Sequence, residues 1–448
     1  MTITEQLGVF VTGATPPAEA RVRAAAAVLD TVGVILAGAV EPASHIVQSV
    51  VAAQGGDGCC VFGASISSSA TGAALANGTA AHALDYDDMC FVSLAHPSAP
   101  LVPAAFAAAE VARASGAALL DAYIVGFEIE ARLGALMNPR HYQRGWHCTS
   151  TLGTIGAAAA ACRLFEMDAA ATGHALAIAT SEASGLKEHF GTMVKPLHAG
   201  LAARNGVLAA LLARGGLTAS ALAIEGPQGF LRAMDSQGTT IGDAIADLGQ
   251  RWEILETGIT VKLYPSCAGT HPSLDAILEM QRAPGFRASD VERIDIEVDA
   301  ITPTVLIYDR PATGLEAKFS MPFCAAAAVT HGHVGLETFE PASVDDPDIK
   351  SLMARVTMTV DPTFDHGAPA LTQARVTIRL TGGRVMSQRV NGARGYPASP
   401  ATDTELDGKF LACAQRALPK ASATRALELL RRIAETDDVR GLATQLMT

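Results

Sequence analysis

Apolar residues fill the first 260 positions in long stretches separated by short polar breaks, a pattern typical of buried helices. The segment 24–39 is almost wholly apolar, and a proline and an acid at 17–19 precede it as they do at helix starts. A helix that is apolar on every side lies inside a protein. Because almost no alternating strand pattern occurs here, we predict one all-helical domain. Further helices are expected at 43–51, 65–84, 101–114, 119–137, 152–162, 168–184 and 201–214, with a short strand at 59–62.

The pattern changes near residue 261, where hydrophobic residues begin to alternate with polar ones. Such alternation at 294–298, 356–360 and 376–380 predicts half-buried antiparallel strands, and Gly382 and Gly383 favour a hairpin after the last of them. With a helix at 273–281, this part predicts a small α+β domain. Helices at 406–417 and 423–435 then return to the helical domain. The expected fold is therefore mainly α, with an all-helical domain at 1–266 and 401–448 and an α+β lid domain at 267–400.

Composition narrows the classes of partner. The 448 residues are 49% hydrophobic and only 17% charged, which indicates a well-buried globular enzyme. A formal charge of −12 without clustered Lys and Arg argues against a nucleic-acid partner. A small anionic substrate stays possible, because one pocket can be positive while the surface is acidic.

The cysteines and apolar stretches indicate a cytoplasmic protein. Eight cysteines are scattered without the CxxC pairs of a metal ribbon, which predicts reduced and mostly buried thiols. The first nine residues hold an acid and no basic segment, so no secretory signal is expected. Charged or Gly- and Ser-rich sequence interrupts the apolar stretches before they reach membrane-spanning length, and we predict no membrane span.

Acidic residues concentrate in the loop after the predicted helix 65–84. Asp85, Asp87 and Asp88 fall within four positions, with His82 before them and His96 after. The flanking apolar helices draw this loop inward, where buried acids need basic partners. A solvated turn is the alternative. A metal cluster of His82, Asp85 and His96 is conceivable, but its spacing matches no metal-binding motif, and we predict no metal.

An isolated lysine marks the second unusual stretch. Lys195 stands beside Pro196 and three residues before His198, between alanine-rich segments where charge is scarce. Burying an ammonium is costly unless it is paired or used, and a partly desolvated lysine has a pKa lowered toward working pH. A lysine that reaches solvent from a helix start is the alternative. Arg204 and Asn205 form a further polar pair downstream.

Two more histidines precede predicted helices. Ser150 or Thr151 can cap one helix and leave His147 at its start, and His271 stands at the start of another. Amide groups and the helix dipole favour an anion at such a position. A structural role is the alternative for each histidine.

These polar groups lie on both sides of the predicted domain boundary, so a cleft between the domains is their natural meeting place. No phosphate loop, nucleophile elbow or cofactor motif stands at a convincing position. The residue types alone predict an enzyme that uses His and Lys as acid and base on a small carboxylic acid, without a cofactor.

Taken together, several motifs resemble the MmgE/PrpD family. Each motif is weak alone, but they run in family order over residues 10 to 440 and are specific as a set. They are HALDYDD at 82–88, HPS at 96–98, GWH at 145–147 with Thr149, KPLH at 195–198, ARNG at 203–206, YPSC at 264–267 with His271, and EAKFS at 316–320.

The resemblance implies a helical domain built from both chain ends, a smaller lid domain, a homodimer and no cofactor. The catalytic positions it implies are Asp85, His96, His147, Lys195 and His271. The expected substrate-binding residues are Arg204, His198, Ser98, Thr149 and Ser266. A tyrosine of the family's decarboxylase branch aligns with Phe323, and Asp85 lies one residue further from His96 than in that branch.

The family's named reactions are 2-methylcitrate dehydration, cis-aconitate decarboxylation and iminodisuccinate epimerisation. Each makes or quenches negative charge on a carbon next to a carboxylate, which requires a base, an acid and cations. The hypothesised roles are base for Lys195 or His147, acid for His96 or His271, carboxylate clamp for Arg204 or the remaining cations, and orientation of His96 or Lys195 for Asp85.

Among these reactions the resemblance favours a 2-methylcitrate-type dehydratase acting on a small di- or tricarboxylate, the family's commonest named role. Epimerisation is the first alternative, because residues 191–193 and 319–320 resemble that branch, and decarboxylation is the second. Outside the family's chemistry, a non-catalytic dicarboxylate-binding protein or a metal-dependent hydro-lyase is the alternative.

Overall fold

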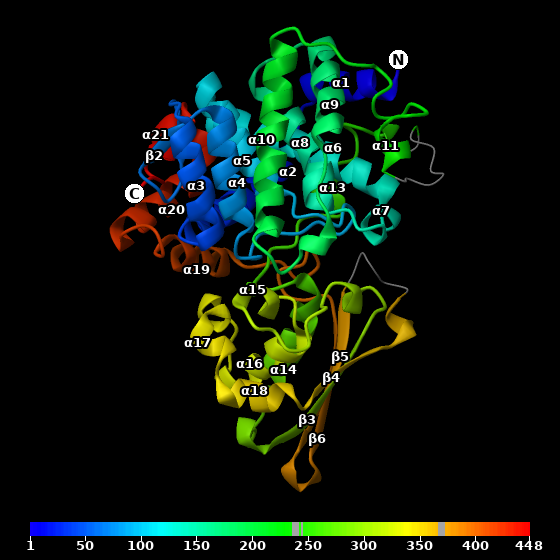
Figure 1. The fold of residues 1–448 in the computed structure, drawn as a ribbon, viewed down its shortest axis with the longest axis vertical. Coiled ribbons are helices and arrows are strands. Elements are labelled where there is room, and N and C mark those ends of the chain that lie inside the picture. Colours follow the sequence, from blue (N-terminus) through cyan, green and yellow to red (C-terminus); the bar gives the residue numbers. More distant parts are fainter. Residues whose placement is uncertain (235–241, 243–244, 366–371) are drawn as a thin grey trace.

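A helical body and a smaller α+β region make up the chain, as the computed structural model of residues 1–234, 242, 245–365 and 372–448 shows. In Figure 1 the body lies above and the α+β region below, with its sheet at the lower right. The predicted fold class, mainly α with a smaller α+β part, is confirmed. The exact domain boundaries stay a prediction.

The helical body is formed by the N-terminal segment together with the last helices of the chain. Its described helices are α1 (Ile3–Gly13), α2 (Ala18–Gly38), α3 (Pro42–Gln54), α4 (Ala70–His82), α5 (Ser98–Ala112), α6 (Gly116–Met137), α7 (Arg140–Gln143), α8 (Cys148–Leu164), α9 (Ala169–Glu182), α10 (Val194–Arg214), α11 (Phe230–Ala233), α13 (Glu253–Glu256), α19 (Asp403–Ala414), α20 (Lys420–Arg431) and α21 (Val439–Thr444), with a small hairpin of β1 (Cys59–Val61) and β2 (Ile66–Ser68).

Small residues bring α4 and α10 into close contact. A Cβ added at Gly78 would lie 2.8 Å from the Cα of Gly200, and one at Gly200 would lie 2.4 Å from the carbonyl oxygen of Leu75. Only glycine allows the two backbones to approach so closely. The pair runs antiparallel, so the last residue of α4, His82, meets the first turn of α10, which carries Lys195.

The C-terminal helices pack on the N-terminal ones, as the sequence predicts. In Figure 1 the red helices lie beside the blue ones, and α19 packs against α2. A buried ion pair joins these two helices, with 2.8 Å between the Nζ of Lys409 and a carboxylate oxygen of Asp30.

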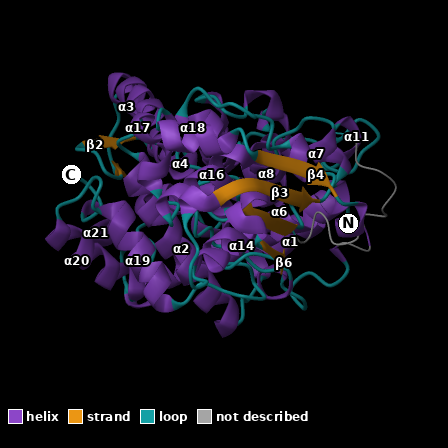
Figure 2. Ribbon diagram, turned by 90° about the horizontal axis from the view of Figure 1, so that it is seen from below, coloured by secondary structure: helices purple, strands orange, loops and turns teal. Residues whose placement is uncertain are grey.

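The α+β region contains one four-stranded sheet with helices packed against it (Figure 2). The strand order is β4-β3-β5-β6, and the elements are α14 (His271–Gln281), β3 (Val291–Val298), α15 (Gly314–Ala317), α16 (Met321–His331), α17 (Pro341–Val344), α18 (Pro347–Met353), β4 (Val356–Val360), β5 (Gln373–Leu380) and β6 (Val385–Asn391).

One prediction about this sheet is wrong. β4 pairs with β3 in parallel, whereas β3–β5 and β5–β6 are antiparallel. Between β3 and β4 the chain passes through α15 to α18, a crossover long enough to return it to the same end of the sheet. The hairpin after β5 forms as predicted, with Gly382 and Gly383 at φ 82° and 80°.

Three helix starts also differ from the sequence-based prediction. The segment before Ala70 pairs as β2, so α4 begins later than expected. α8 begins at Cys148, which makes His147 the N-cap and puts Ser150 and Thr151 inside the first turn. α10 begins at Val194, because a proline at Pro196 is compatible with a first helical turn.

Within the described residues, no single helix combines the length and apolar composition needed to cross a membrane. α2 and α3 have that length and composition only when taken together, and they are bent by 88° relative to each other. All eight cysteines are unpaired, and seven of them are buried.

Candidate active site

Asp85 lies at the centre of a buried ionic cluster at the end of α4. Its carboxylate is 2.5 Å from the Nζ of Lys195 and 3.1 Å from the Nζ of Lys262. Lys262 also donates to the backbone carbonyl of Asp85 over 2.9 Å. The residue has a left-handed backbone with φ 51°, which aspartate adopts more readily than most other residues that carry a Cβ. In this backbone conformation the carboxylate contacts both ammonium groups.

The two lysines determine the charge of that carboxylate. Burial alone would raise the pKa of Asp85, but Lys195 and Lys262 lower it well below the ordinary range. Asp85 is therefore ionised, and the two ammonium groups share its single negative charge. The sequence-based interpretation did not identify Lys262, although its position between Val261 and Leu263 is as apolar as that of Lys195.

His82 links Lys195 to a second acid. The Nζ of Lys195 donates to the Nε2 of His82 over 2.9 Å, and the Nδ1 of His82 lies 2.7 Å from a carboxylate oxygen of Asp87. Burial lowers the pKa of His82 to about 3 against the opposing effect of Asp87, so the ring is neutral. Because Nε2 accepts from Lys195, Nδ1 carries the proton that binds Asp87.

His96 closes the cluster from the other end of the loop. Its Nδ1 is 3.3 Å from Asp87 and its Nε2 is 3.9 Å from Asp85. The Thr149 hydroxyl accepts a hydrogen bond from the backbone N–H of His96 over 3.0 Å and so fixes this part of the loop. Burial lowers the pKa of His96, which favours a neutral imidazole.

His147 extends the row of imidazoles at the start of α8. Its Nδ1 lies 3.1 Å from the Nδ1 of His198, and within the described residues its Nε2 has no hydrogen-bond partner although the side chain is buried. Burial and the neighbouring His82 lower the pKa of His147 well below its ordinary value. An unsatisfied polar atom at a helix start is suited to bind an anionic group of a ligand.

A cavity lies beside this cluster between the helical body and the α+β region, with about 680 Å³ of space between atoms, part of which is open to solvent. The body contributes Asp85, Met89, Phe91, Leu94, His96, Tyr142, His147, Phe190 and Lys195. The α+β region and the segments leading into it contribute Cys267, Ala268, Gly269, Asp299, Ile301, Thr302, Val305, Phe319 and Thr372. A mostly apolar lining with a few polar side chains is typical of a small-molecule site.

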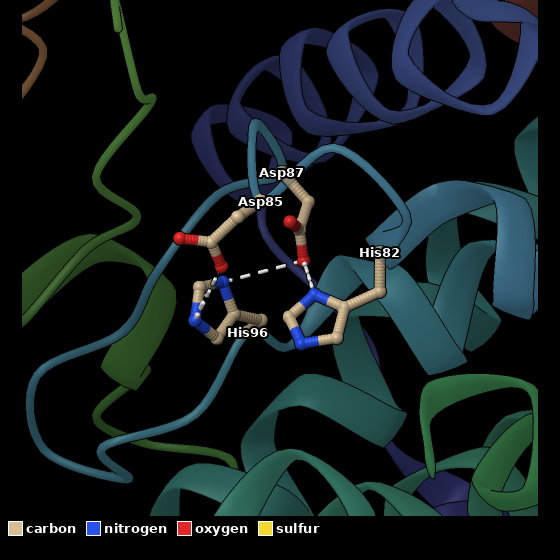
Figure 3. Close-up of side chains that lie close together, drawn as sticks. All are labelled: His82, Asp85, Asp87 and His96. Atoms are coloured by element: carbon tan, nitrogen blue, oxygen red, sulfur yellow. Dashed lines mark hydrogen bonds and ion pairs between the residues drawn. The ribbon is translucent and has the colours of Figure 1, made fainter. Parts of the chain in front are cut away.

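Four side chains in the cluster are close enough to hold a metal ion. Figure 3 shows them pointing toward one another, with their ligand atoms all within 4.8 Å: His82, Asp85, Asp87 and His96. His82 and Asp85 already bind the Lys195 ammonium, and Lys262 forms a second ion pair with Asp85. A divalent cation would lie against two ammonium groups, so the donor set fits an ion-pair network better than a metal.

Four of the five predicted catalytic residues line the cavity together: Asp85, His96, His147 and Lys195. His271 does not. Its ring packs against Tyr264, and its Nε2 lies 3.1 Å from the carbonyl oxygen of Ser266. Cys267, four residues earlier in the chain, lines the cavity, whereas the sequence analysis expects His271 there.

None of the five predicted substrate-binding residues belongs to the cavity lining. His198 contacts His147, and Thr149 positions His96, so both support cavity residues. Ser98 donates to Asp88 and lies 2.6 Å from the Tyr123 hydroxyl.

The other two predicted ligands also have partners elsewhere. The Ser266 hydroxyl is 2.8 Å from that of Thr270, and Arg204 donates to Asn205 over 2.9 Å. Nine positions apart on α10, Arg204 and Lys195 are separated by about 13.5 Å along the helix axis. None of Ser98, Ser266 and Arg204 supplies a direct substrate contact in this geometry.

Phe323, the position that aligns with a tyrosine of the family's decarboxylase branch, lies away from the cavity. Its ring lies in the core of the α+β region against Phe339, with centroids 5.9 Å apart, and does not line the cavity. A different phenol, that of Tyr142, does. The absence of a tyrosine at position 323 therefore does not leave the cavity without a phenol.

Comparison with known proteins gives consistent results. The MmgE/PrpD N-terminal domain matches residues 5–240, and the MmgE/PrpD C-terminal domain matches residues 264–435. The cis-aconitate decarboxylase-like protein oryM of Aspergillus oryzae is 30% identical over 75% of this chain and 74% of its own length. Cis-aconitate decarboxylase of Homo sapiens is 26% identical over 84% and 79%, and that of Aspergillus terreus 27% over 78% and 76%.

Proposed function

The chain belongs to the MmgE/PrpD family, and from that premise we propose that it is a cofactor-independent lyase that decarboxylates a small carboxylic acid. The relatives named cis-aconitate decarboxylases support this reaction over the dehydration that the sequence resemblance favours. A homodimer and a cytoplasmic location remain part of the proposal.

The observation that carries the proposal is the position of the Lys195 ammonium. Among the described residues that line the cavity, it is the only Lys or Arg side chain. Asp85 at 2.5 Å and His82 at 2.9 Å hold it in place, and the histidines around it are neutral because burial lowers their pKa values. Lys195 is therefore the proton donor with the best position and charge.

Decarboxylation uses these groups in one proton transfer. The bond from carbon to the leaving carboxylate breaks, carbon dioxide departs, and the electron pair stays on a carbon next to a second carboxylate. Lys195 transfers a proton to that carbon and is reprotonated from solvent. Phe190 and Phe319, whose ring centroids lie 5.3 and 5.2 Å from the Lys195 Nζ, keep water away from the reacting carbon.

Dehydration is the second candidate, because neutral imidazoles beside an ammonium also provide a base and an acid. His96 or His147 would remove the proton, and Lys195 would protonate the departing hydroxide. Epimerisation would use the same groups on opposite faces of the substrate carbon.

Proton NMR in D₂O with cis-aconitate, 2-methylcitrate and iminodisuccinate distinguishes these reactions. We expect release of carbon dioxide and a product that carries deuterium on the carbon that lost its carboxylate. Loss of water would identify a dehydratase, and deuterium at the α-carbon without net conversion would identify an epimerase. Binding of all three acids without exchange or conversion would indicate a non-catalytic binding protein.

A further inference from the structure

The C-terminal helix α19 carries a buried lysine that reaches the active site from outside the described cavity lining. In Figure 1 this helix lies at the end of the helical body that faces the α+β region. Resting on the proposed reaction, we propose that Lys409 is a positioning residue, which holds Asp85 where its carboxylate binds Lys195. The evidence is the set of hydrogen bonds that Lys409 donates and the segments that these bonds join.

The Lys409 ammonium has an acceptor for each of its three N–H groups. The carboxylate of Asp30, on α2, lies at 2.8 Å, and the backbone carbonyl oxygens of Tyr86 and Lys262 lie at 2.8 and 2.9 Å. The ammonium also lies 4.0 Å from the centroid of the Tyr86 ring. Lys409 is 6% exposed and Asp30 2%. Because an ammonium has three donors, this one is fully used inside the protein.

The two carbonyls that Lys409 binds belong to segments next to the reacting groups. Tyr86 directly follows Asp85, whose carboxylate is 2.5 Å from the Lys195 Nζ. Lys262 donates to the Asp85 carbonyl over 2.9 Å, and its Nζ is 3.1 Å from the Asp85 carboxylate. Lys409 therefore fixes the backbone that follows Asp85 and also the backbone of the lysine that binds Asp85.

Three buried lysines together hold the loop of residues 84–86. Its successive carbonyls accept hydrogen bonds from Lys318, Lys262 and Lys409, in that order, over 2.7, 2.9 and 2.8 Å. Lys318 and Lys409 also bind the segment 262–265, at the carbonyls of its last and first residues. Neither segment is helix or strand, and a buried carbonyl without a donor is costly. The position of the loop therefore depends on these side-chain donors.

A purely structural role is the alternative, because the pair of Asp30 and Lys409 also joins α2 to α19. Removing Lys409 alone leaves the Asp30 carboxylate buried without a cation, which destabilises the fold. Removing both charges avoids this penalty, since uncharged residues can replace a buried ion pair with little loss of stability. Loss of stability and loss of position can therefore be separated.

The double variant Asp30→Asn/Lys409→Met separates the two roles. It leaves the carbonyls of Tyr86 and Lys262 without this donor and changes no residue of the described cavity lining. With the acid that the wild-type protein turns over, we expect kcat to fall about 10-fold or more, because small misplacements of reacting groups slow a reaction strongly, and KM to stay within about 3-fold. A kcat within about 3-fold of wild type in a double variant with wild-type circular dichroism would overturn the proposal.

A second ion pair on α2 provides the matched control. Arg21 of this helix binds Asp121 of α6, with 2.6 Å between Nε and a carboxylate oxygen. Arg21→Met/Asp121→Asn likewise removes one positive and one negative charge between two body helices, and it should keep the wild-type kcat. An equal fall of kcat in this control would assign the loss to weaker helix packing and would overturn the proposal.

The NMR signal of the Lys195 ammonium keeps this test separate from the proposed reaction. In protein labelled with ¹⁵N-lysine, this signal is assigned by its loss in Lys195→Ala. It should shift in Asp30→Asn/Lys409→Met and stay in place in Arg21→Met/Asp121→Asn, and an unchanged signal in the former would overturn the positioning role. A wild-type protein that releases no carbon dioxide would reject the proposed reaction, whereas the signal would still report the position of Lys195.

Discussion

The two sides of the cavity contribute different things. The helical body supplies nearly all the titratable groups, with Asp85, His96, His147 and Lys195 on three converging segments, whereas the α+β side supplies mainly apolar residues and backbone. The body holds its groups through the close contact of α4 and α10, where a substituent on Gly78 or Gly200 would collide with the other helix. We therefore expect proton transfer to depend on the packing of the helical body, and selection of the substrate to depend more on the α+β side.

The two sides are joined at few points that bear directly on the site. Lys318 of the α+β region donates to the carbonyl of Leu84, one residue before Asp85, and Tyr308 donates to the carbonyl of Phe190. Changes on the α+β side should thus alter substrate preference more than the proton-transfer step, and changes in the body should do the opposite.

The largest effect on stability is expected from an acid of the body that does not face the cavity. Burial raises the pKa of Asp88 to about 7, despite hydrogen bonds from Ser98. A raised folded-state pKa means that Asp88 contributes stability at low pH that is lost as pH rises from about 4 to 7. Asparagine at this position does not ionise, so the variant does not lose this stability. The difference in the free energy of unfolding between Asp88→Asn and wild type should therefore grow by about 2 to 3 kcal/mol in favour of the variant from pH 5 to pH 8.5.

Guanidinium unfolding at the two pH values measures this difference. Asp57→Asn, in an exposed loop, is the control and should show the same difference from wild type at both pH values. If Asp88→Asn changes the free energy of unfolding equally at both pH values, the pKa of Asp88 is not raised in the folded protein.

A smaller effect, on rate, is expected from the acid next to it. Asp87 orients His82 as the tautomer that accepts from Lys195. An amide at this position can donate to Nδ1 and turn the N–H of Nε2 toward the ammonium. Asp87→Asn should lower kcat about 10-fold or more, shift the pH profile of kcat, and leave KM within a factor of about 3.

Asp88→Asn, one residue away and with no contact to the imidazoles, is the matched control and should keep kcat near that of wild type. A wild-type pH profile in a folded Asp87→Asn protein would remove Asp87 from the positioning of Lys195.

The smallest effect is expected from Arg204, which the sequence assigns to carboxylate binding. Because its guanidinium donates to Asn205 and does not line the cavity, Arg204→Gln should change kcat and KM less than about 2-fold. A large rise in KM with unchanged kcat would show that the residue reaches the substrate after all.

The sequence predicts the polar side of this site better than the apolar side. Lys195, Asp85 and His147 can be identified because a charged or polar group in an apolar context needs a reason to be buried. Phe190 and Phe319 give no such indication, because an apolar residue that lines a cavity is indistinguishable in sequence from one in the core.

The sequence also does not indicate which side chain near a helix start faces the cavity. The YPSC segment predicts that something near residue 271 faces the cleft, but the turn before α14 directs Cys267 inward and packs His271 against Tyr264. The apolar neighbours of Lys262 indicate a buried lysine, but its pairing with Asp85 depends on the tertiary structure. The parallel pairing of β3 and β4 likewise depends on the crossover and not on local alternation.

The role of Lys195 as proton donor is tested most directly by comparing wild type with Lys195→Ala in D₂O, using the acid that the wild-type protein turns over and recording carbon dioxide release and deuterium in the product. General acid–base groups contribute about 10² to 10⁴ in rate, so we expect release to fall at least 100-fold in a variant with wild-type circular dichroism. Wild-type-like release and deuteration by folded Lys195→Ala would contradict the account.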